Sequence, residues 1–406
     1  MIFAAIDWAE QNHVILVMDA EGTTLDKARI EHGHSGFREL DLILRKHAKD
    51  PQEVMVALEL NEGLLLDWLL AGRYQVFGIN PKSAERARDR YTPAGLKDDE
   101  RDTWALAEFI RTSYQHLRPM RPDSQQTTAL RAWVRLREDL VQERTIHIQR
   151  LRSHLVMWNP HLLRAVNDLN AQWTLDLLEK TPTAESFAKL THRQIEHFAQ
   201  GRRMRSVTKD RVLTQATFHS PNVQPARNEA HAIEVRYRVC AIRHLHEQIN
   251  EIDLKLAELI ENHPDVNIFR SLPVAGVVTT ATFLAGFGED RQRWTGHEEV
   301  AARWGAAPVT QQSGKYRTVK RRMARDATVH QAWIWFSFNT IRQKDCWARS
   351  YYQEKRKSGT DHYTALRCTA QRWIKITYRL WYDQVLYDEE IHQARRKERQ
   401  QPRIEK

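Results

Sequence analysis

The segment Ile2–Asp19, "IFAAIDWAEQNHVILVMD", decides the fold of the first part of the chain. It holds two apolar runs, Ile2–Asp7 and His13–Asp19, on either side of a short polar segment. Apolar runs of this length bounded by polar residues are typical of β-strands, and a short connection pairs them as a hairpin. The same texture continues outward, with strand-like runs "EVMVALE" and "YQVFGIN" and helix-like runs "HSGFRELDLILRKHA" and "EGLLLDWLLAG". The sequence therefore predicts an α/β domain over residues 1–124 that opens with a hairpin.

The whole chain is long and basic. It has 406 residues, 41% of them hydrophobic, which is enough for several domains. Its 62 Lys and Arg residues outnumber the 52 acidic residues and give a formal charge of +10. This balance favours a polyanionic partner, without indicating which one.

The cysteines and the N-terminus indicate a cellular compartment. Cys240, Cys346 and Cys368 lie far apart and fit neither a disulfide framework nor a zinc-binding spacing, so we expect a reducing environment. The first residues lack the basic and apolar regions of a signal peptide, and no run of about 18 apolar residues occurs. We therefore expect a cytoplasmic protein with no membrane partner.

The middle of the chain, residues 125–263, has a helical pattern. Its last part places apolar residues at alternating spacings of three and four, which is a heptad seam: Ile242, Leu245, Ile249, Ile252, Leu256 and Leu259. An earlier arm carries a comparable set: Leu130, Trp133, Leu140, Ile148, Leu151 and Leu155. The two arms can form a helical hairpin within one chain, or the seam can join protomers as a coiled coil; we expect the second. Residues 159–228 between the arms read as an insertion of unknown role.

The last part of the chain reads as two segments. Residues 264–390 form a compact and mainly helical C-terminal domain. Residues 391–406 form a basic tail, which contains "ARRKERQQPRIEK" and is expected to be disordered.

Four acidic residues of the first domain form the clearest chemical pattern. Asp7 ends the first strand-like run, and Glu59 ends "EVMVALE". Asp99 and Asp102 are three residues apart at the start of a helix, on one face. Side chains at strand ends project into the crevice at the edge of a sheet, and carboxylate oxygens are the ligands that Mg²⁺ prefers. Each acid alone can be a helix cap or a solvated charge, but the combination predicts a site for two Mg²⁺ ions.

A second pattern lies in "WGAAPVTQQSGKYR", residues 304–317, where Ser313 precedes Gly314. Taken alone, the serine can be a turn residue or a nucleophile, and nothing next to it looks like its general base. Gly314 allows a close approach of the backbone to a phosphate. A dense basic run follows and predicts nucleic-acid contacts: Lys315, Arg317, Lys320, Arg321, Arg322 and Arg325.

The order of these motifs resembles the DEDD transposases of insertion-sequence family one-hundred-and-ten. The matching motifs are Asp7, Glu59, "INP" at residues 79–81 and "KDDERD" at residues 97–102. Residues 271–317 are similar to the second transposase domain of that family, which begins with a helix-hairpin-helix-like segment and carries a reactive serine in a Gln-Ser-Gly motif. Three positions depart from the family pattern: Val274 stands where a Gly is usual, Asp98 where a Thr is usual, and Asp326-Ala327 where Gly-Asn is usual.

The resemblance implies a fold and a mechanism. The first domain would be a RuvC-like member of the RNase H fold, followed by the coiled-coil region and the transposase domain. The protein would be a recombinase of a prokaryotic mobile element, acting at the nucleoid, whose noncoding guide RNA pairs with donor and target DNA. Ser313 would attack a DNA phosphate to form a covalent intermediate, with the carboxylate-bound metals as its activator in a composite site. A dimer or tetramer would hold the two DNA duplexes.

Two other classes of protein fit the residues themselves. A metal-dependent nuclease of the junction-resolving kind would use the four acids with water as nucleophile and leave Ser313 idle. A nucleic-acid-binding scaffold would use only the basic helices and need no metal. Cleavage separates the second class from the first, and a covalent protein–DNA adduct separates the nuclease from the recombinase.

Overall fold

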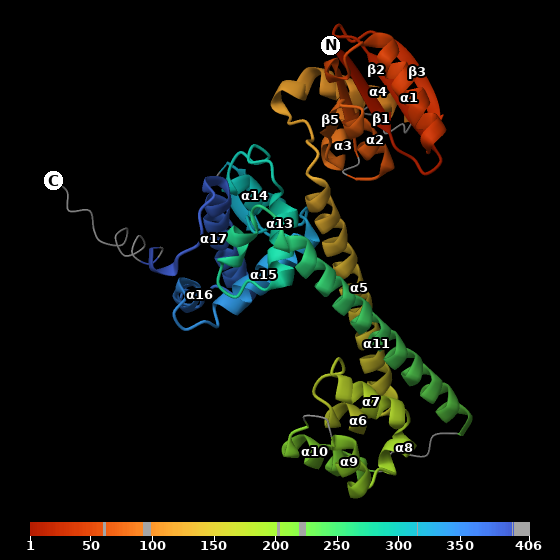
Figure 1. The fold of residues 1–406 in the computed structure, drawn as a ribbon, viewed down its shortest axis with the longest axis vertical. Helices are drawn as coiled ribbons and strands as arrows, with labels where there is room; N and C mark the ends of the chain where they lie inside the picture. Colours follow the sequence, from red (N-terminus) through yellow and green to blue (C-terminus); the bar gives the residue numbers. More distant parts are fainter. Residues whose placement is uncertain are drawn as a thin grey trace, which may run out of the picture. The chain divides into compact units, whose positions relative to one another are not determined.

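The computed structural model describes residues 1–59, 62–91, 99–200, 204–218, 225–314, 316–391 and 393. The chain divides into two compact units, Met1–Asp123 and Ser124–Lys406 (Figure 1). Within the described ranges, no helix has both the length and the apolar character needed to cross a membrane.

The first unit is built on a five-stranded mixed sheet, which confirms the predicted α/β character. The strand order is β3-β2-β1-β4-β5, with antiparallel pairs among β1, β2 and β3 and parallel pairs from β1 to β4 and from β4 to β5. The strands are β1 (Ile2–Asp7), β2 (Asn12–Met18), β3 (Thr24–Glu31), β4 (Val54–Leu58) and β5 (Gln75–Gly78). Strand β3 lies at the edge, and only its Ile30 is buried. It lacks the apolar run that marks the other strands, which is why the sequence pattern missed it.

Helices cover both faces of this sheet. Side chains alternate along a strand, so Ile6 and Val56 face one side while Ala5 and Ala57 face the other. The first side packs on α1 (His34–His47) and α2 (Leu64–Ala71). The second packs on α3 (Pro81–Tyr91) and α4 (Asp99–Ser113). Residues of α4 contact the sheet through a buried stripe that ends in Leu106, Ala107 and Ile110.

The second unit contains two long helices that pack against each other, α5 (Gln125–Trp158) and α11 (Pro225–Glu261) (Figure 1). The heptad seam of α11 lies in the apolar cores that α5 shares: Ile242 packs in one core with Leu151 and Leu155, and Ile252 and Leu256 pack in another with Leu130 and Val134. The expectation that this seam joins protomers is wrong for these residues, because their own chain covers them. The helical hairpin within one chain is the arrangement found.

The segment between the two long helices forms a small helical bundle. Its helices are α6 (Pro160–Ala165), α7 (Gln172–Lys180), α8 (Ala184–Ala188), α9 (His192–Ala199) and α10 (Ser206–Ala216). Leu162, Leu175, Phe187 and Ile195 pack in a shared core with the ends of α5 and α11. The insertion is therefore a folded part of the hairpin.

Substituting Ile249 by aspartate tests the covered seam. Ile249 is 3% exposed on α11, so an aspartate there would place an unpaired charge between two packed helices. We expect the free energy of unfolding to fall by about 3 kcal/mol or more. This loss corresponds to a melting temperature about 6–12 °C lower in calorimetry. Leu254→Asp is the matched control, because Leu254 lies on the same helix and is 74% exposed. Equal melting of the two variants would contradict the buried position of the seam.

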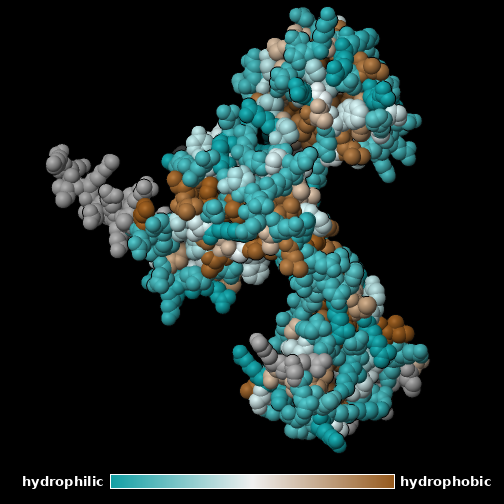
Figure 2. Space-filling model, in the orientation of Figure 1, coloured by the Kyte–Doolittle hydropathy of each residue, from teal (hydrophilic) through white to brown (hydrophobic). Residues whose placement is uncertain are grey.

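The C-terminal part of the second unit surrounds an aromatic core. Its helices are α12 (Val266–Arg270), α13 (Val277–Phe287), α14 (His297–Arg303), α15 (Ala327–Thr340), α16 (Trp347–Lys357) and α17 (His362–Asp383). The largest fully buried side chains include Trp304, Trp333, Trp373 and Trp381. A two-stranded ribbon, β6 (Val309–Ser313) and β7 (Tyr316–Lys320), connects α14 to α15. On the face of the protein seen in Figure 2, hydrophilic side chains dominate the surface and apolar side chains appear in separate patches.

Candidate active site

Two of the predicted acids meet at the carboxyl edge of the sheet. The parallel register of β1 and β4 pairs Ile2 with Val54 and continues to Ile6 with Leu58. Extended by one residue, this register places Asp7 beside Glu59. Side-chain alternation then turns both toward the α4 face of the sheet, together with Ala5 and Ala57.

The other two acids come from the first turn of α4. Asp99 and Asp102 lie in that turn, and Leu106 and Ile110 continue their face of the helix into the core. Carboxylates are favoured there by the unpaired N–H groups and the dipole at the start of a helix. Asp98, at the departure from the family pattern, lies outside the described residues.

The charges of the four acids act on one another. The pKa of the Asp7 carboxyl is raised, first by burial and then by the negative charges of the other three: Asp99, Glu59 and Asp102. Like charges raise a carboxyl pKa only when they lie close, so the structure brings all four predicted acids into one neighbourhood. A cation bound among them would relieve this repulsion.

An arginine that the sequence pattern missed stands among these acids. Arg88 of α3 places its Nη1 3.3 Å from Oε1 of Glu59 and 3.6 Å from Oδ2 of Asp102. Its positive charge lowers the pKa of Asp7, against the larger effects of burial and the acids. Arg88 is four residues after Ala84, so both lie on one face of α3, but only the structure shows that this face packs against the sheet.

The acids fit a divalent cation by their chemistry rather than by their present spacing. All of their side-chain donors are oxygens, as Mg²⁺ requires, and they carry excess negative charge. Among the described residues, no three acidic, histidine or cysteine side chains are close enough to coordinate one ion. Arg88 provides a reason, because its guanidinium lies between two of the carboxylates. Metal binding would require this guanidinium to move.

Ser313 lies in the second unit, at the tip of the β6–β7 ribbon. It is the last residue of β6 and pairs with Tyr316 of β7. Gly314 follows in the left-handed conformation, with a φ of 55°, which favours glycine. A Cβ at Gly314 would meet open space, so the tip is not crowded. Ser313 is exposed, and no hydrogen bond joins its hydroxyl to another residue of the described chain.

The basic residues after Ser313 divide between two locations. Cross-strand pairing places Gln312 opposite Arg317, so Arg317 projects from the ribbon face opposite to that of Ser313. Lys320 shares the face of Ser313 but pairs with Val309 at the other end of the ribbon. Lys315 lies outside the described residues.

Three arginines gather beyond the ribbon: Arg321, Arg322 and Arg325. Burial lowers the pKa of Arg325, and the positive charges of Arg321 and Arg367 lower it further. The Nε atoms of Arg322 and Arg325 are buried and find no hydrogen-bond partner among the described residues. Crowded cations with unused donors form a favourable place for an anion. Arg367 of α17 belongs to this cluster, although it is 42 residues beyond Arg325 in the chain.

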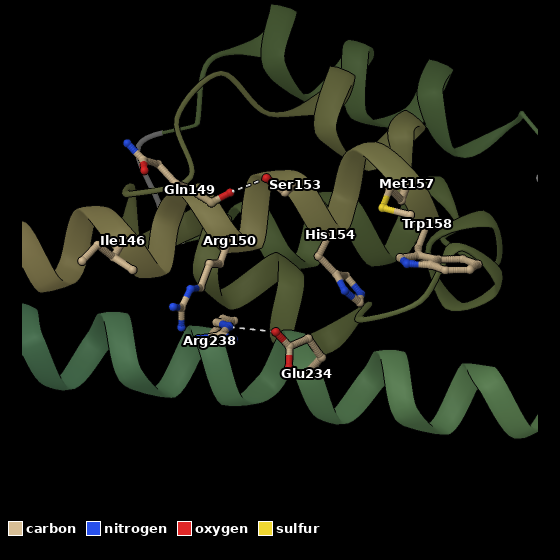
Figure 3. Close-up of a pocket in the computed structure, with 9 residues that line it drawn as sticks. All are labelled: Ile146, Gln149, Arg150, Ser153, His154, Met157, Trp158, Glu234 and Arg238. Carbon is tan, nitrogen blue, oxygen red and sulfur yellow. Dashed lines mark hydrogen bonds and ion pairs between the residues drawn. The ribbon is translucent and has the colours of Figure 1, made fainter.

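A groove of about 500 Å³ lies between α5 and α11 (Figure 3). Arg150 of α5 and Arg238 of α11 project into it, with His154 and Trp158 further along α5. Arg238 donates a hydrogen bond of 2.8 Å to Glu234, whereas Arg150 forms no ion pair with a described residue. The Trp158 ring lies 4.1 Å from that of His231. Local sequence patterns do not reveal this basic and aromatic surface, because its residues come from two helices that are far apart in the chain.

Comparisons with known proteins identify transposase families in both halves of the chain. A family model described as a transposase matches residues 4–160, and the model of the transposase IS116/IS110/IS902 family matches residues 266–353. The mini-circle putative transposase for IS117 of Streptomyces coelicolor is 30% identical over 385 residues, which cover 92% of each chain.

Two further relatives are similar over different lengths. The insertion element IS900 uncharacterized 42 kDa protein of Mycobacterium paratuberculosis is 25% identical, covering 95% of this chain and 97% of its own. A putative transposase, y4uE, of Sinorhizobium fredii is 34% identical over 205 residues, or 50% of this chain and 57% of its own. The similarity to the mini-circle putative transposase covers 92% of this chain, so it includes most of the residues outside the two matched domains.

Proposed function

The chain belongs to the IS116/IS110/IS902 family of insertion-sequence transposases, and from this premise we propose that it cleaves and exchanges DNA strands by metal-dependent phosphoryl transfer under the guidance of a noncoding RNA. The observation that carries the proposal is the convergence of charge on Asp7. Burial, and then acids from one other strand end and one helix start, raise the pKa of this single carboxyl. Such concentrated negative charge, which one arginine offsets only in part, is typical of a catalytic site.

The strand order supports a RuvC-like RNase H fold for the first unit. A hairpin of three antiparallel strands continues into two parallel strands, and the acids end the adjacent strands β1 and β4. The proposed metal ligands are Asp7, Glu59, Asp99 and Asp102. Two Mg²⁺ ions bound there would polarise the scissile phosphate and activate the attacking oxygen. Arg88 would balance the acidic charge in the absence of metal and contact the DNA phosphate when displaced.

We assign the nucleophile to Ser313. Its Oγ attacks the phosphorus and gives up its proton to a base or to solvent, while the bond from phosphorus to a DNA sugar oxygen breaks and that oxygen takes up a proton to leave as a hydroxyl. The phosphodiester becomes a phosphoserine ester of similar energy, so the step can be reversed onto a different DNA end without ATP. The exposed tip of the ribbon supports this assignment, because a DNA strand can reach the hydroxyl. The arginines beyond the ribbon would hold the DNA backbone.

A covalent adduct is the decisive test of this function over a water-using nuclease. Purified protein would be incubated with its co-purified RNA, Mg²⁺ and a nicked DNA that traps the intermediate. We expect a protein–DNA species that resists denaturant, and the sequence of the co-purified RNA would identify the guide. DNA products without any adduct would favour the nuclease, and the absence of RNA would remove the guided mechanism.

We also propose that the groove between α5 and α11 holds part of the guide RNA. Arg150 provides a cation without a carboxylate partner, and the neighbouring Trp158 and His154 provide aromatic surface. Phosphate contact and aromatic stacking are the common means of binding single-stranded RNA.

Arg150→Ala is expected to weaken guide binding and to lower the slope of log affinity against log salt by about 1. Fluorescence anisotropy over a salt series would measure both quantities. Arg152→Ala is the matched control, because Arg152 is exposed on the same helix and does not line the groove. Equal slopes for the two variants would place the RNA elsewhere.

A further inference from the structure

An exposed indole lies at the carboxyl edge of the sheet, on the α1 side, whereas the acids face α4. Trp8 follows Asp7 in the chain and is 41% exposed. Its ring stacks on His13, with centroids 6.2 Å apart and planes 27° apart. His13 in turn stacks on Phe37, at 6.2 Å and 20°. A stack of three rings thus leads from the buried core to the carboxyl edge of the sheet.

Hydrogen bonds hold the middle ring of this stack in place. The backbone N–H of Ala9 donates to Nδ1 of His13 at 3.2 Å, so Nδ1 carries no proton. The proton is then on Nε2 of His13, which donates to Nδ1 of His32 at 2.9 Å. His13 is fully buried, and burial lowers its pKa, with a smaller effect from His32. The segment after Asp7 is therefore fixed to a neutral and immobile ring, and the backbone bond from His32 to Gln11 closes it.

We propose that Trp8 is a stacking platform for an unpaired base of the DNA strand whose phosphate is presented to Asp7. A single exposed apolar residue is ordinary on a protein surface and indicates nothing alone. What distinguishes Trp8 is its rigid support and its position one residue from the acid at the centre of the site.

The chemistry of the site favours a base over other occupants. Without bound metal the four carboxylates repel phosphate, so a strand at this edge gains from an uncharged contact. Stacking on an aromatic ring supplies about 1–3 kcal/mol per base and accepts any base. Such tolerance suits a protein whose sequence choice is made by RNA pairing. The inference rests on the proposed function in one respect, that DNA is the strand held at Asp7.

Photo-crosslinking tests the contact. A 20-residue single-stranded DNA containing 5-iodouracil would be bound to the full chain in Ca²⁺, irradiated and digested for mass spectrometry. We expect the crosslinked peptide to contain Trp8. We also expect Trp8→Leu to weaken single-strand affinity about tenfold, within the range for one lost stack. Trp8→Phe should retain most of the affinity, because a ring remains.

Matched measurements separate stacking from structure. Affinity for fully paired duplex DNA should not change in Trp8→Leu, because paired bases cannot reach the ring, and the melting temperature should stay within a few degrees. Trp335→Leu, at a 56% exposed indole of α15, should leave single-strand affinity unchanged. Equal single-strand affinity for Trp8→Leu and wild type would overturn the proposal. A change in oligomeric state without a change in affinity would overturn it as well, in favour of a protein contact. If Asp7→Asn cleaves DNA normally while Trp8 still crosslinks, the proposed function fails and the platform stands.

Discussion

Asp7→Asn is expected to reduce DNA strand cleavage by about a thousandfold or more, which corresponds to about 4 kcal/mol of transition-state stabilisation. Asp7 is the acid on which the charges of Glu59, Asp99 and Asp102 converge. Asparagine has nearly the same shape but lacks the negative charge that would bind the metals. Nucleic-acid binding should change little, since affinity for nucleic acid comes mainly from Lys and Arg contacts to phosphates, which this substitution does not remove. Rates would be measured under single-turnover conditions with saturating guide and DNA.

The same substitution should raise stability in metal-free buffer. The pKa of Asp7 is raised in the folded protein, so the folded state binds its proton more tightly than the unfolded chain does. Stability therefore falls as the pH rises from the ordinary pKa of an aspartate upward, and the cost is complete once Asp7 ionises. Asparagine removes this cost, so the variant should melt higher than wild type at pH 7 and lose less stability between pH 4 and pH 7.

A divalent cation should oppose this difference in stability between Asp7→Asn and wild type. A ligand that binds only the folded state stabilises it by about 2.7 kcal/mol at a hundred times its dissociation constant. Mg²⁺ should therefore raise the melting temperature of wild type more than that of Asp7→Asn. Asp67→Asn is the control, because Asp67 is exposed on α2, which packs against the other face of the sheet. Normal cleavage by Asp7→Asn, or an equal effect of Mg²⁺ on both proteins, would remove Asp7 from the metal site.

Ser313→Ala is expected to lose both the covalent adduct and recombination below detection. Alanine preserves the ribbon but has no oxygen to attack phosphorus. The side chain is exposed and forms no hydrogen bond with a described residue, so folding should be unaffected. Denaturing gels would reveal the adduct, and sequencing of DNA junctions would measure recombination.

Two comparisons give this result its meaning. Thr310→Ala removes a hydroxyl from the same strand but, by the alternation of side chains, from the opposite face of the ribbon, and it should keep activity. Asp7→Asn should also lose the adduct if metals activate the serine, whereas a serine activated locally would still form some. If Ser313→Ala cleaves DNA at the wild-type rate and neither protein forms an adduct, Ser313 is only a turn residue and water is the nucleophile.

Local sequence was sufficient to predict the strands of the first domain and the acids at their ends. The apolar runs that begin at Ile2 and Val54 predict buried strands. Successive side chains of a strand point to opposite faces of the sheet, so a run that is apolar throughout must be buried on both faces. An acid directly after such a run must lie at the edge of the sheet, so Asp7 and Glu59 could be identified without coordinates. Asp326 is similar: it departs from the family pattern but caps α15 by accepting a hydrogen bond from the N–H of Val329.

Positions that depend on a partner could not be identified in this way. A heptad stripe indicates that one face of a helix will be buried, but the partner that buries it can be a neighbouring helix of the same chain or a second protomer. The burial of Ile252 and Leu256 in one core with Leu130 of α5 decided between them. Val274 is a related case, since nothing in its own chemistry favours its φ of 55°, and only the turn before α13 imposes it.

The sequence by itself determined the α/β first domain, the positions of the four acids and a Ser313-Gly314 motif that suits a turn, because each depends on the pattern of a few adjacent residues. Tertiary structure alone decided which charges and rings meet. Arg88 reaches Glu59 and Asp102 from another helix, and Trp8 stacks on His13 of β2, which in turn stacks on Phe37 of α1. Coulomb energy and ring stacking depend on distance in space. Residues far apart in the chain come close together only when the sheet and its helices pack.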